Sequence, residues 1–361
     1  MACPRQPLTG EVREPAGERG EDPLTGRPVV VLGASGFLGR HLCSAFAAAG
    51  AQVIGVSRSV PDAGDGPPGR TVSLDLARAG VRRLAALCAD TDAEVVVNAS
   101  GAVWGGTEQR MTELNAELVG RLAEAVAGSP GRPRLVQLGS AYEYGPAHPG
   151  SVTCEDSPPA PASVYGRTKL LGSRTVLCAA EEKGVDGVVL RVSVACGPGA
   201  PRGSLPGTVA EHLAAGRTEL RLAPLRSYRD FVDVRDVADA VLAASRAPAA
   251  SVAGRVVNIG GGQAVPVRRL VDLMIELSGR PLRVVEELPA QVTRSDAPWQ
   301  RLDIARARRL LGWSPRRTLE DSLRDLLIAA GALGTRGRTE GARGVRPRAH
   351  AGSEGQGKDR R

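Results

Sequence analysis

The chain has 361 residues, of which 42% are hydrophobic and 24% are charged, which is enough for one large α/β domain or two smaller ones around a substantial core. No window approaches 18 consecutive apolar residues, and the first twenty residues lack an apolar stretch. We therefore expect neither a membrane span nor a secretory signal.

The six cysteines are scattered along the chain, without any Cys-x-x-Cys spacing. They are Cys3, Cys43, Cys88, Cys154, Cys178 and Cys196. This pattern is typical of free thiols in a reducing cytoplasm rather than of a zinc site or a disulfide framework. We expect a cytoplasmic protein without a bound metal.

The formal net charge of +8 comes mainly from the end of the chain. Residues 333–361 hold eight basic side chains against three acidic ones, whereas residues 1–27 hold four arginines against five acids. No aromatic residues accompany the basic tail, so we expect no nucleic-acid partner. The compositions predict that residues 1–27 and 333–361 are disordered, solvated extensions.

From residue 28 onward, short β-branched runs alternate with longer helical patterns. The expected strands are Pro28–Gly33, Gln52–Val56, Thr71–Leu74, Glu94–Ala99, Arg134–Gly139 and Gly187–Val194. The expected helices are Phe37–Ala49, Val81–Ala89, Met111–Ala127 and Val164–Lys183. Such alternation with short connections predicts an α/β fold with a doubly wound parallel sheet, covered by helices on both faces.

The pattern changes after residue 197, where proline and glycine interrupt it. The elements expected beyond are Val209–Ala215, Glu219–Leu222, Val237–Ser245, Arg255–Ile259 and Arg268–Ser278. We therefore predict a nucleotide-binding domain over residues 28–197 and, over residues 198–332, mainly a smaller substrate-binding lobe.

A Gly-x-x-Gly-x-x-Gly motif links the first strand to the first helix. Glycines permit a tight turn and a close approach of the backbone to a pyrophosphate, and the helix N-terminus adds N–H donors. Its strand-before and helix-after context favours a dinucleotide site over an ordinary glycine-rich turn. The residues predicted to bind the cofactor here are Gly33, Ser35, Gly36, Phe37, Leu38 and Gly39.

The end of the second strand predicts which dinucleotide binds. An NAD site usually places an acid there, but this chain has Ser57-Arg58-Ser59. An acid would repel a 2′-phosphate, whereas a hydroxyl followed by a guanidinium can bind it. NADP is therefore favoured, with NAD as the alternative. Asp75, followed by Leu76, is a candidate partner for the adenine amino group.

A serine, a tyrosine and a lysine form the candidate catalytic group. Tyr165 and Lys169 lie one helical turn apart, and Ser140 ends the preceding strand. With four tyrosines and three lysines in the chain, chance predicts only about 0.03 Tyr-x-x-x-Lys pairs. Reduction of a ketone needs a proton donor, and a nearby cation would lower the pKa of the phenol for that task. The serine hydroxyl would orient the carbonyl oxygen.

These residues and their order resemble the extended short-chain dehydrogenases/reductases, the nucleotide-sugar epimerase, dehydratase and reductase family. The resemblance covers about residues 28–327 and includes the following segments: Asn98-Ala99-Ser100, Gly139-Ser140-Ala141, Tyr144-Gly145, Gly197-Pro198-Gly199, Arg229-Asp230-Phe231, Asn258-Ile259-Gly260 and Leu311-Gly312-Trp313. It implies a Rossmann sheet and a catalytic trio of Ser140, Tyr165 and Lys169.

The resemblance also implies roles for residues outside the trio. Asn115 would support the proton relay, and Ala99 would contact the cofactor. Arg229 and Arg294 would bind a substrate diphosphate. Family members often pair through the helices that hold Asn115 and Tyr165, which implies a homodimer.

Three activities compete within the family. Dehydratases carry two acids before the Tyr-Gly pair, but Ala141 and Tyr142 stand there, and Glu143 is one position out of register. Epimerases recycle a bound cofactor, usually NAD, whereas a net reductase draws on NADPH, which fits Ser57-Arg58. The run around Leu222–Val237 and the Gly-Ser-x-x-Glu-Tyr-Gly segment most resemble the reductases of nucleotide-linked 4-keto-6-deoxyhexoses. This resemblance implies an NADPH-dependent reductase of such a sugar.

One departure keeps other activities open. Where the family usually has an asparagine that contacts the substrate diphosphate, this chain has Val194, a substrate-contact position by resemblance, next to Ser193. The alternatives are a nucleotide-sugar 4-epimerase and a ketoreductase acting on a non-sugar metabolite. A non-catalytic dinucleotide sensor is disfavoured by the intact trio.

Overall fold

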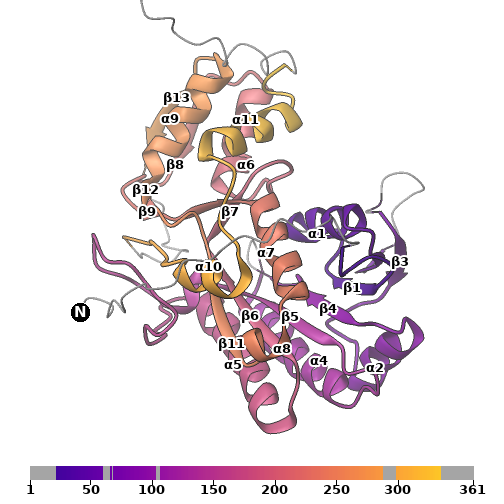
Figure 1. Cartoon of the computed structure of the whole chain (residues 1–361). Helices are drawn as coiled ribbons and strands as arrows, with labels where there is room; N and C mark the ends of the chain where they lie inside the picture. Colours follow the sequence, from indigo (N-terminus) through magenta and orange to yellow (C-terminus); the bar gives the residue numbers. More distant parts are fainter. Residues whose placement is uncertain (1–21, 60–65, 67, 103–105, 288–297, 335–361) are drawn as a thin grey trace, which may run out of the picture.

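A seven-stranded parallel sheet forms the centre of the computed structural model, which describes residues 22–59, 66, 68–102, 106–287 and 298–334 (Figure 1). Its strands are β1 (Pro28–Leu32), β2 (Gln52–Ser57), β3 (Arg70–Ser73), β4 (Val95–Asn98), β5 (Arg134–Ser140), β6 (Gly187–Val192) and β11 (Arg255–Ile259). They are arranged in the order β11-β6-β5-β4-β1-β2-β3. The doubly wound α/β fold predicted from the alternating pattern is confirmed.

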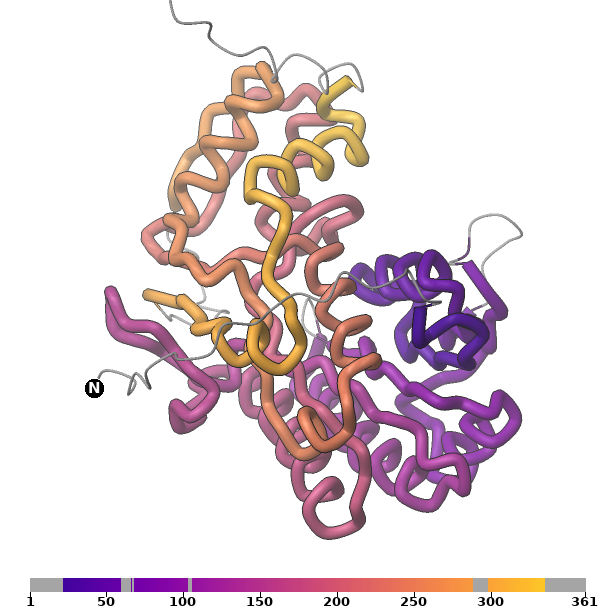
Figure 2. Tube along the Cα trace, viewed as in Figure 1, coloured from indigo at the N-terminus to yellow at the C-terminus, as the bar shows by residue number. Residues whose placement is uncertain are grey.

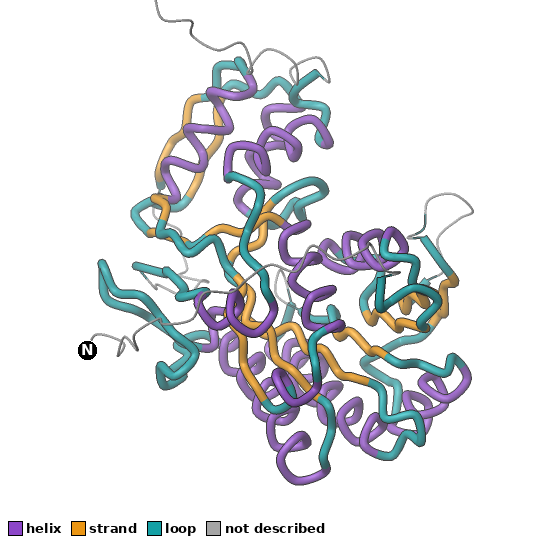
Figure 3. The backbone as a smooth tube through the Cα atoms, viewed as in Figure 1, coloured by secondary structure: helices purple, strands orange, loops and turns teal. Residues whose placement is uncertain are grey.

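Helices cover both faces of this sheet, which explains why its central strands are almost continuously apolar. One hydrophobic core lies between the sheet and α1 (Phe37–Ala48), α7 (Val234–Arg246) and α10 (Ala305–Leu311). A second core lies under α2 (Val81–Asp90), α4 (Leu118–Ala127) and α5 (Val164–Lys183). Figure 3 shows the strands between the two helical layers. None of the described helices has the length and apolarity that a membrane crossing requires.

A smaller lobe stands beyond one end of the sheet (Figure 1). A third core holds together α6 (Leu205–Ala214), α9 (Val267–Ser278) and α11 (Leu319–Ala329) with the paired strands β8 (Glu219–Leu222) and β13 (Arg283–Glu286). Two short ladders lead into it. They pair β7 (Val194–Cys196) with β10 (Phe231–Asp233), and β9 (Tyr228–Arg229) with β12 (Val265–Pro266).

The predicted division at residue 197 implies that the chain passes only once from the large sheet to the smaller lobe. In the structure it passes between them more than once. It leaves the sheet after β6, returns through α7, the short α8 (Ala249–Val252) and β11, and then enters the smaller lobe again. Figure 2 shows this return as the orange part of the tube passing beside the large sheet. Residues 234–259 therefore belong to the nucleotide-binding region, because β11 pairs with β6 and α7 packs on α1.

The expected N-terminal extension ends earlier than residue 27. Leu24 is 1% exposed and packs into the core under α1 and α7. Asp22 also accepts a hydrogen bond of 2.8 Å from Nε of Arg246 on α7. Residues 22–27 are thus part of the packed structure, while residues 1–21 and 335–361 lie outside the described residues.

Two expected elements are divided in the structure. The helix predicted over residues 111–127 consists of α3 (Glu108–Thr112), one π-helical turn (Glu113–Glu117) and α4. The strand predicted over residues 187–194 breaks at Ser193, whose N–H bonds to Ile259 O in the large sheet, while the Val194 N–H bonds to Asp230 O in the next ladder. For the strand, local propensity favours one continuous element, and the different partners of Ser193 and Val194 divide it.

Candidate active site

The predicted cofactor and catalytic residues gather at the carboxyl ends of the parallel strands. β1 lies between β2 and β4 in the sheet, so the chain winds in opposite directions on its two sides. The crevice at such a switch point is where open α/β sheets bind ligands. Gly33 follows β1, Ala99 follows β4, and Ser140 ends β5. The Ala99 N–H bonds to Leu32 O at 3.1 Å, which ties these loops together.

The glycines of the loop are required by their surroundings. Gly33 has φ of +80°, and a Cβ there would meet the backbone of Ser100 at 3.0 Å. A Cβ on Gly39 would lie only 2.0 Å from Gly33 O. The glycines therefore allow β1, the loop and α1 to pack backbone against backbone, as a dinucleotide-binding turn requires.

The first turn of α1 leaves its N–H groups available. Gly36 is the N-cap, and no side chain caps this end of the helix. The helix is held from its side instead, since Nε2 of His41 contacts Pro198 O at 2.9 Å and the Arg40 guanidinium donates to Gly199 O at 3.3 Å. An uncapped helix N-terminus behind a glycine turn fits the pyrophosphate of a dinucleotide. Ser35, Phe37 and Leu38 occupy this same turn.

The end of β2 presents a cation to the same crevice. Ser57 is buried, and its hydroxyl donates to Ser59 O at 2.5 Å, while the Ser73 hydroxyl donates to Arg58 O at 2.9 Å. These bonds fix the backbone and leave the Arg58 side chain exposed. Among the described residues, no acidic side chain forms an ion pair with Arg58. A free guanidinium here fits the ribose 2′-phosphate of NADP.

Asp75 and Leu76 lie in the turn that follows β3. The Asp75 carboxylate accepts from the Ala77 N–H at 3.1 Å and remains 43% exposed at its side chain. Leu76 is buried, and its carbonyl accepts from Arg121 of α4 at 3.3 Å. The carboxylate thus organises its own turn, and its other oxygen lies 4.0 Å from Nε of Arg78. A contact with an adenine amino group stays a prediction.

Ser140 and Tyr165 meet as the sequence predicts. Burial raises the pKa of Tyr165 to about 12, and a hydrogen bond with the Ser140 side chain acts against that rise. The Tyr165 ring also packs edge-on against Tyr142, with ring centroids 5.8 Å apart. In this structure burial thus raises the pKa of the phenol, and the Ser140 side chain acts against that rise. The lowering of this pKa by Lys169 stays a prediction.

Lys169 lies one turn further along α5 and is buried. Its ammonium donates to Leu138 O at 2.5 Å, and a Cβ built on Gly101 would lie 4.0 Å from Nζ. Burial lowers the pKa of Lys169 to about 8, and the charge of Glu143 acts in the opposite direction. The lysine thus lies beneath the loop after β4, anchored to β5.

Asn115 sits in the π-helical turn and is buried. Its amide donates to Ala102 O at 3.0 Å and to the Thr168 hydroxyl at 3.1 Å, and its Oδ1 accepts from the Ala102 N–H at 3.0 Å. These contacts clamp the loop after β4 against α5. The side chain is thereby positioned to hold the site together, and a direct part in a proton relay stays a prediction.

Glu143, which was not among the predicted site residues, is a buried acid directly behind Ser140. Glu143 is 0% exposed and accepts from the Ser140 N–H at 2.8 Å, from the Ser173 hydroxyl at 2.9 Å and from Nε of Arg191 at 2.7 Å. In the sequence, the only sign of this residue was that Glu143 stands one position away from where dehydratases carry an acid. Its shift by one position turns it into the interior instead of toward a substrate.

The predicted substrate contacts lie between the large sheet and the smaller lobe. Val194 begins β7 and is partly buried, and Arg229 ends β9, where its guanidinium donates to Tyr228 O at 2.9 Å. Asp230 between them is buried and accepts from the N–H groups of Gly261 and Leu302 at 2.6 and 2.9 Å. Arg294 lies outside the described residues.

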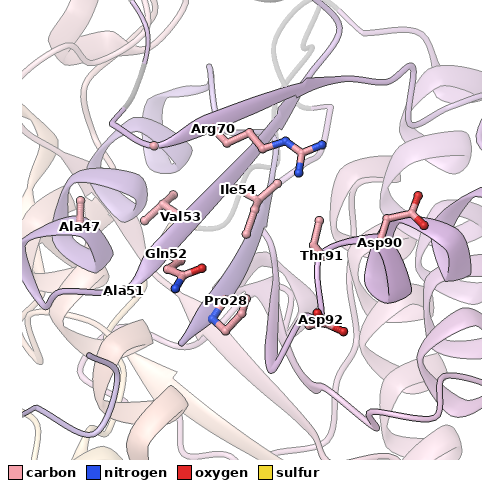
Figure 4. A pocket seen from close by; sticks show the side chains of 11 residues that line it. Pro28, Ala47, Ala51, Gln52, Val53, Ile54, Arg70, Asp90, Thr91 and Asp92 are labelled. Carbon is pink, nitrogen blue, oxygen red and sulfur yellow. The ribbon is translucent and has the colours of Figure 1, made fainter. Parts of the chain in front are cut away.

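A surface hollow of about 540 Å³ lies at the opposite edge of the sheet (Figure 4). It is lined by residues that include Pro28 and Gln52, which begin β1 and β2, together with Arg70 and Asp92. Ligands of open α/β sheets bind at the carboxyl ends of the strands, and this hollow is at the amino ends. It is therefore separate from the candidate active site.

Comparisons with known proteins agree with this geometry. Residues 29–260 match the NAD dependent epimerase/dehydratase family. A dTDP-6-deoxy-L-talose 4-dehydrogenase (NAD(P)(+)) from Kitasatospora kifunensis is 42% identical over 306 residues, covering 83% of this chain and 95% of that protein. A UDP-glucose 4-epimerase from Mycolicibacterium smegmatis is 29% identical over 311 residues, covering 81% and 95%.

A solved structure, that of MoeE5 in complex with UDP-glucuronic acid and NAD, matches with a TM-score of 0.72 at 26% identity. The match covers 84% of this chain and 98% of MoeE5. The resemblance read from the motifs is confirmed, as is the NAD(P) class of cofactor. The chain belongs to the NAD dependent epimerase/dehydratase family and is an NAD(P)-dependent enzyme of the extended short-chain dehydrogenase/reductase type.

Proposed function

We propose that this enzyme reduces the C4 ketone of a nucleotide-linked 4-keto-6-deoxyhexose with NADPH. The observation that carries the proposal is the 42% identity, over 83% of this chain and 95% of the relative, to a dehydrogenase whose name specifies C4 of a dTDP-linked 6-deoxyhexose. Dehydrogenation at C4 is the reverse of 4-keto reduction, so one active site serves both directions. A dTDP-4-keto-6-deoxyhexose is therefore the first substrate to test.

The side chains supply orientation and a proton. When bound, the nicotinamide supplies the hydride that adds to the sugar carbon. Ser140 would hydrogen-bond the carbonyl oxygen and align it with Tyr165, which would donate its phenolic proton as negative charge develops on that oxygen. An alkoxide is far more basic than a phenolate, so a phenol whose pKa is about 12 remains acidic enough to protonate it.

Lys169 would act on Tyr165 after this proton transfer. Its ammonium lies beneath the site and would stabilise the phenolate that proton donation leaves behind. Burial lowers the lysine pKa to about 8, so the positively charged form still predominates at neutral pH. We therefore assign Tyr165 as the proton donor and Lys169 as its electrostatic support.

NADPH is favoured over NADH by the end of β2. The exposed Arg58 guanidinium, the neighbouring hydroxyls and the lack of an acid at the end of this strand suit a 2′-phosphate. Gly33, Gly36 and Gly39 with the uncapped N-terminus of α1 would hold the pyrophosphate, and Asp75 the adenine amino group.

Arg229 would bind the substrate diphosphate, with Arg294 as its expected companion. Arg229 lies just before the strand that pairs with Val194, so the nucleotide part of the substrate would lie toward the smaller lobe and the sugar near Tyr165. The enzyme would act in the cytoplasm as a homodimer that buries α5, on which Leu171 is 51% exposed. Light scattering after gel filtration tests the dimer.

A nucleotide-sugar 4-epimerase is the second candidate, favoured by the match to the mycobacterial epimerase over 95% of its length. An epimerase uses the same trio but returns the hydride to the sugar it came from. Its cofactor would stay bound, and no net oxidation would be seen.

The test is an absorbance assay at 340 nm with purified enzyme, NADPH and a dTDP-4-keto-6-deoxyhexose. Oxidation of NADPH in proportion to product is the expected result. Interconversion of UDP-glucose and UDP-galactose with no change in absorbance would select the epimerase instead. Failure of both reactions, with tight NADPH binding retained, would leave a ketone outside the nucleotide sugars as the substrate class.

A further inference from the structure

Glu143 is a fully buried acid that the reaction proposed above does not use. It belongs to a single 3-10 turn (Ala141–Glu143) that follows β5, and Ser140 is the N-cap of that turn. The carboxylate folds back and accepts from the N–H of Ser140, while the Ser140 hydroxyl accepts from the Tyr142 N–H at 3.3 Å. Both ends of the turn are therefore fixed around the residue that would orient the substrate carbonyl.

The charge of Glu143 is balanced by Arg191 on the neighbouring strand β6. Arg191 is 3% exposed, and its guanidinium carbon lies 4.4 Å above the centre of the Tyr144 ring. Tyr144 in turn donates its hydroxyl to Asn258 on β11 at 2.7 Å. Three adjacent strands thus support the carboxylate, since β5 carries Ser140, β6 carries Arg191 and β11 carries Asn258.

The space around the carboxylate is closed. A Cβ built on Gly139 would lie 2.6 Å from Glu143 Oε1, and the Ser173 hydroxyl of α5 occupies another side of that oxygen. The carboxylate therefore fits in one position only, and its hydrogen bond with the Ser140 N–H holds the backbone of Ser140 in place. A 1 Å displacement of a group that orients substrate can lower a rate by about 100-fold.

We propose that Glu143 is a positioning residue, whose carboxylate, held by Arg191 and Ser173, fixes the backbone of Ser140 so that its hydroxyl meets Tyr165 and the substrate oxygen. The inference rests on the proposed function of Ser140 and Tyr165. Glu143 itself is fully buried behind Ser140, so it would touch neither substrate nor cofactor.

A pair of matched double variants isolates the hydrogen bond from the charge. Replacing both charges, as in Glu143→Gln with Arg191→Met, leaves no unpaired buried ion and keeps an acceptor oxygen for the Ser140 N–H. Glu143→Met with Arg191→Met has the same net charge and similar volume, but no acceptor. Methionine at position 191 keeps apolar contact with the Tyr144 ring.

We expect the variant with methionine at 143 to have a kcat about 10-fold to 100-fold below that of the variant with glutamine. The Kd for NADPH, measured by fluorescence quenching, should be the same in both. Amide hydrogen exchange of the 138–144 segment should be faster with methionine, because the Ser140 N–H loses its acceptor. Equal kcat in two folded variants would overturn the proposal.

The ion pair at the opposite end of the same strand supplies a control. Arg134 of β5 donates to Asp186 at 2.9 Å, far from Ser140 along the strand. Asp186→Asn should lower the unfolding temperature and leave kcat unchanged. A role of Glu143 in stability alone would make its variants behave in the same way, which would contradict the positioning role.

Two further measurements keep the outcome decisive. If the double variants do not fold, Ser173→Ala removes one donor to the carboxylate by deleting a single hydroxyl, and we expect kcat to fall a few-fold at unchanged NADPH affinity. An unchanged kcat would then count against the proposal. Wild-type turnover is measured first, so that an inactive wild type reports a failure of the proposed substrate and not of Glu143.

Discussion

The two halves of the candidate active site are held in different ways. The phosphate side, from Gly33 to Gly39, rests on glycines and backbone groups that are close in sequence. The catalytic side, around Ser140 and Tyr165, rests on buried polar and charged side chains from the turn after β5 and from α5, β6 and β11.

This difference predicts two kinds of sensitivity. A turn made of backbone N–H groups changes little with pH, but it tolerates no added volume. A site held by a buried carboxylate, a lysine and an arginine is sensitive to substitutions that remove one of these charges. It also responds to pH, because each charge is buried. The following experiments separate the two.

The largest effect is expected at the catalytic side. Tyr165→Phe removes the proposed proton donor and keeps the ring against Tyr142, so turnover should fall by about 10²-fold to 10⁴-fold. Affinity for NADPH should stay near that of the wild type, because the phosphate side is untouched. Steady-state rates and a binding titration measure this, and a near-normal rate would refute the assignment of Tyr165.

On the phosphate side, volume is the sensitive property. Gly39→Ala would place a methyl group 2.0 Å from Gly33 O, so we expect the free energy of unfolding to fall by about 1–3 kcal/mol and NADPH affinity to fall at least about tenfold. Gly120→Ala in α4 is the control, since a Cβ there meets nothing within 4 Å and alanine favours a helix by about 1 kcal/mol. Equal behaviour of the two variants would contradict the packing argument.

Stability should depend on pH through Asp230. Burial raises the pKa of this carboxyl to about 6, above its usual 3.8. The folded state therefore binds more protons than the unfolded state between these values, so the contribution of Asp230 to stability is present at low pH and is lost as the pH rises through 6. Between pH 4.5 and pH 7, we expect it to lose about 2 kcal/mol.

Asp230→Asn isolates this contribution. The variant should be less stable than the wild type, because an amide group would face the N–H donors of Gly262 and Leu302. The difference from the wild type in chemical denaturation should be larger at pH 4.5 than at pH 7. A difference that is the same at both pH values would show that Asp230 does not titrate in this range.

The smallest effect is expected in cofactor choice. Arg58→Ala should lower the preference for NADPH over NADH by about tenfold, since one charge-assisted contact to the 2′-phosphate is lost. Arg83→Ala on the exposed face of α2 is the matched control and should not change the ratio. The ratio of kcat/KM for the two cofactors measures it, and an unchanged ratio in the Arg58 variant would remove that residue from the site.

Much of the fold follows from local patterns in the sequence. The runs at Pro28–Leu32 and Val95–Asn98 are apolar except for the final asparagine, which predicts strands buried on both faces. The helix expected over Val164–Lys183 has these bounds in the structure, between the N-cap Ser163 and the C-cap Gly184. The break at Ser193 was not predictable in this way, because it depends on which partner each N–H finds after folding.

The same holds for the site. Tyr165 and Lys169 are one turn apart on a single helix, so sequence spacing alone places them together. Glu143 and Arg191 are 48 residues apart, and only the pairing of β5 with β6 brings them into contact. The sequence marks Glu143 as an acid in an unusual position but does not say which way it turns.

Glycine spacing, apolar periodicity and the rare Tyr-x-x-x-Lys pair determine the class of fold, the cofactor turn and the catalytic helix, because each depends on neighbours within a few residues. The tertiary structure alone decides how burial changes the acidity of Tyr165, Lys169 and Asp230. Acidity depends on every charge and dipole within several ångströms, and those groups come from strands and helices that are distant in the chain.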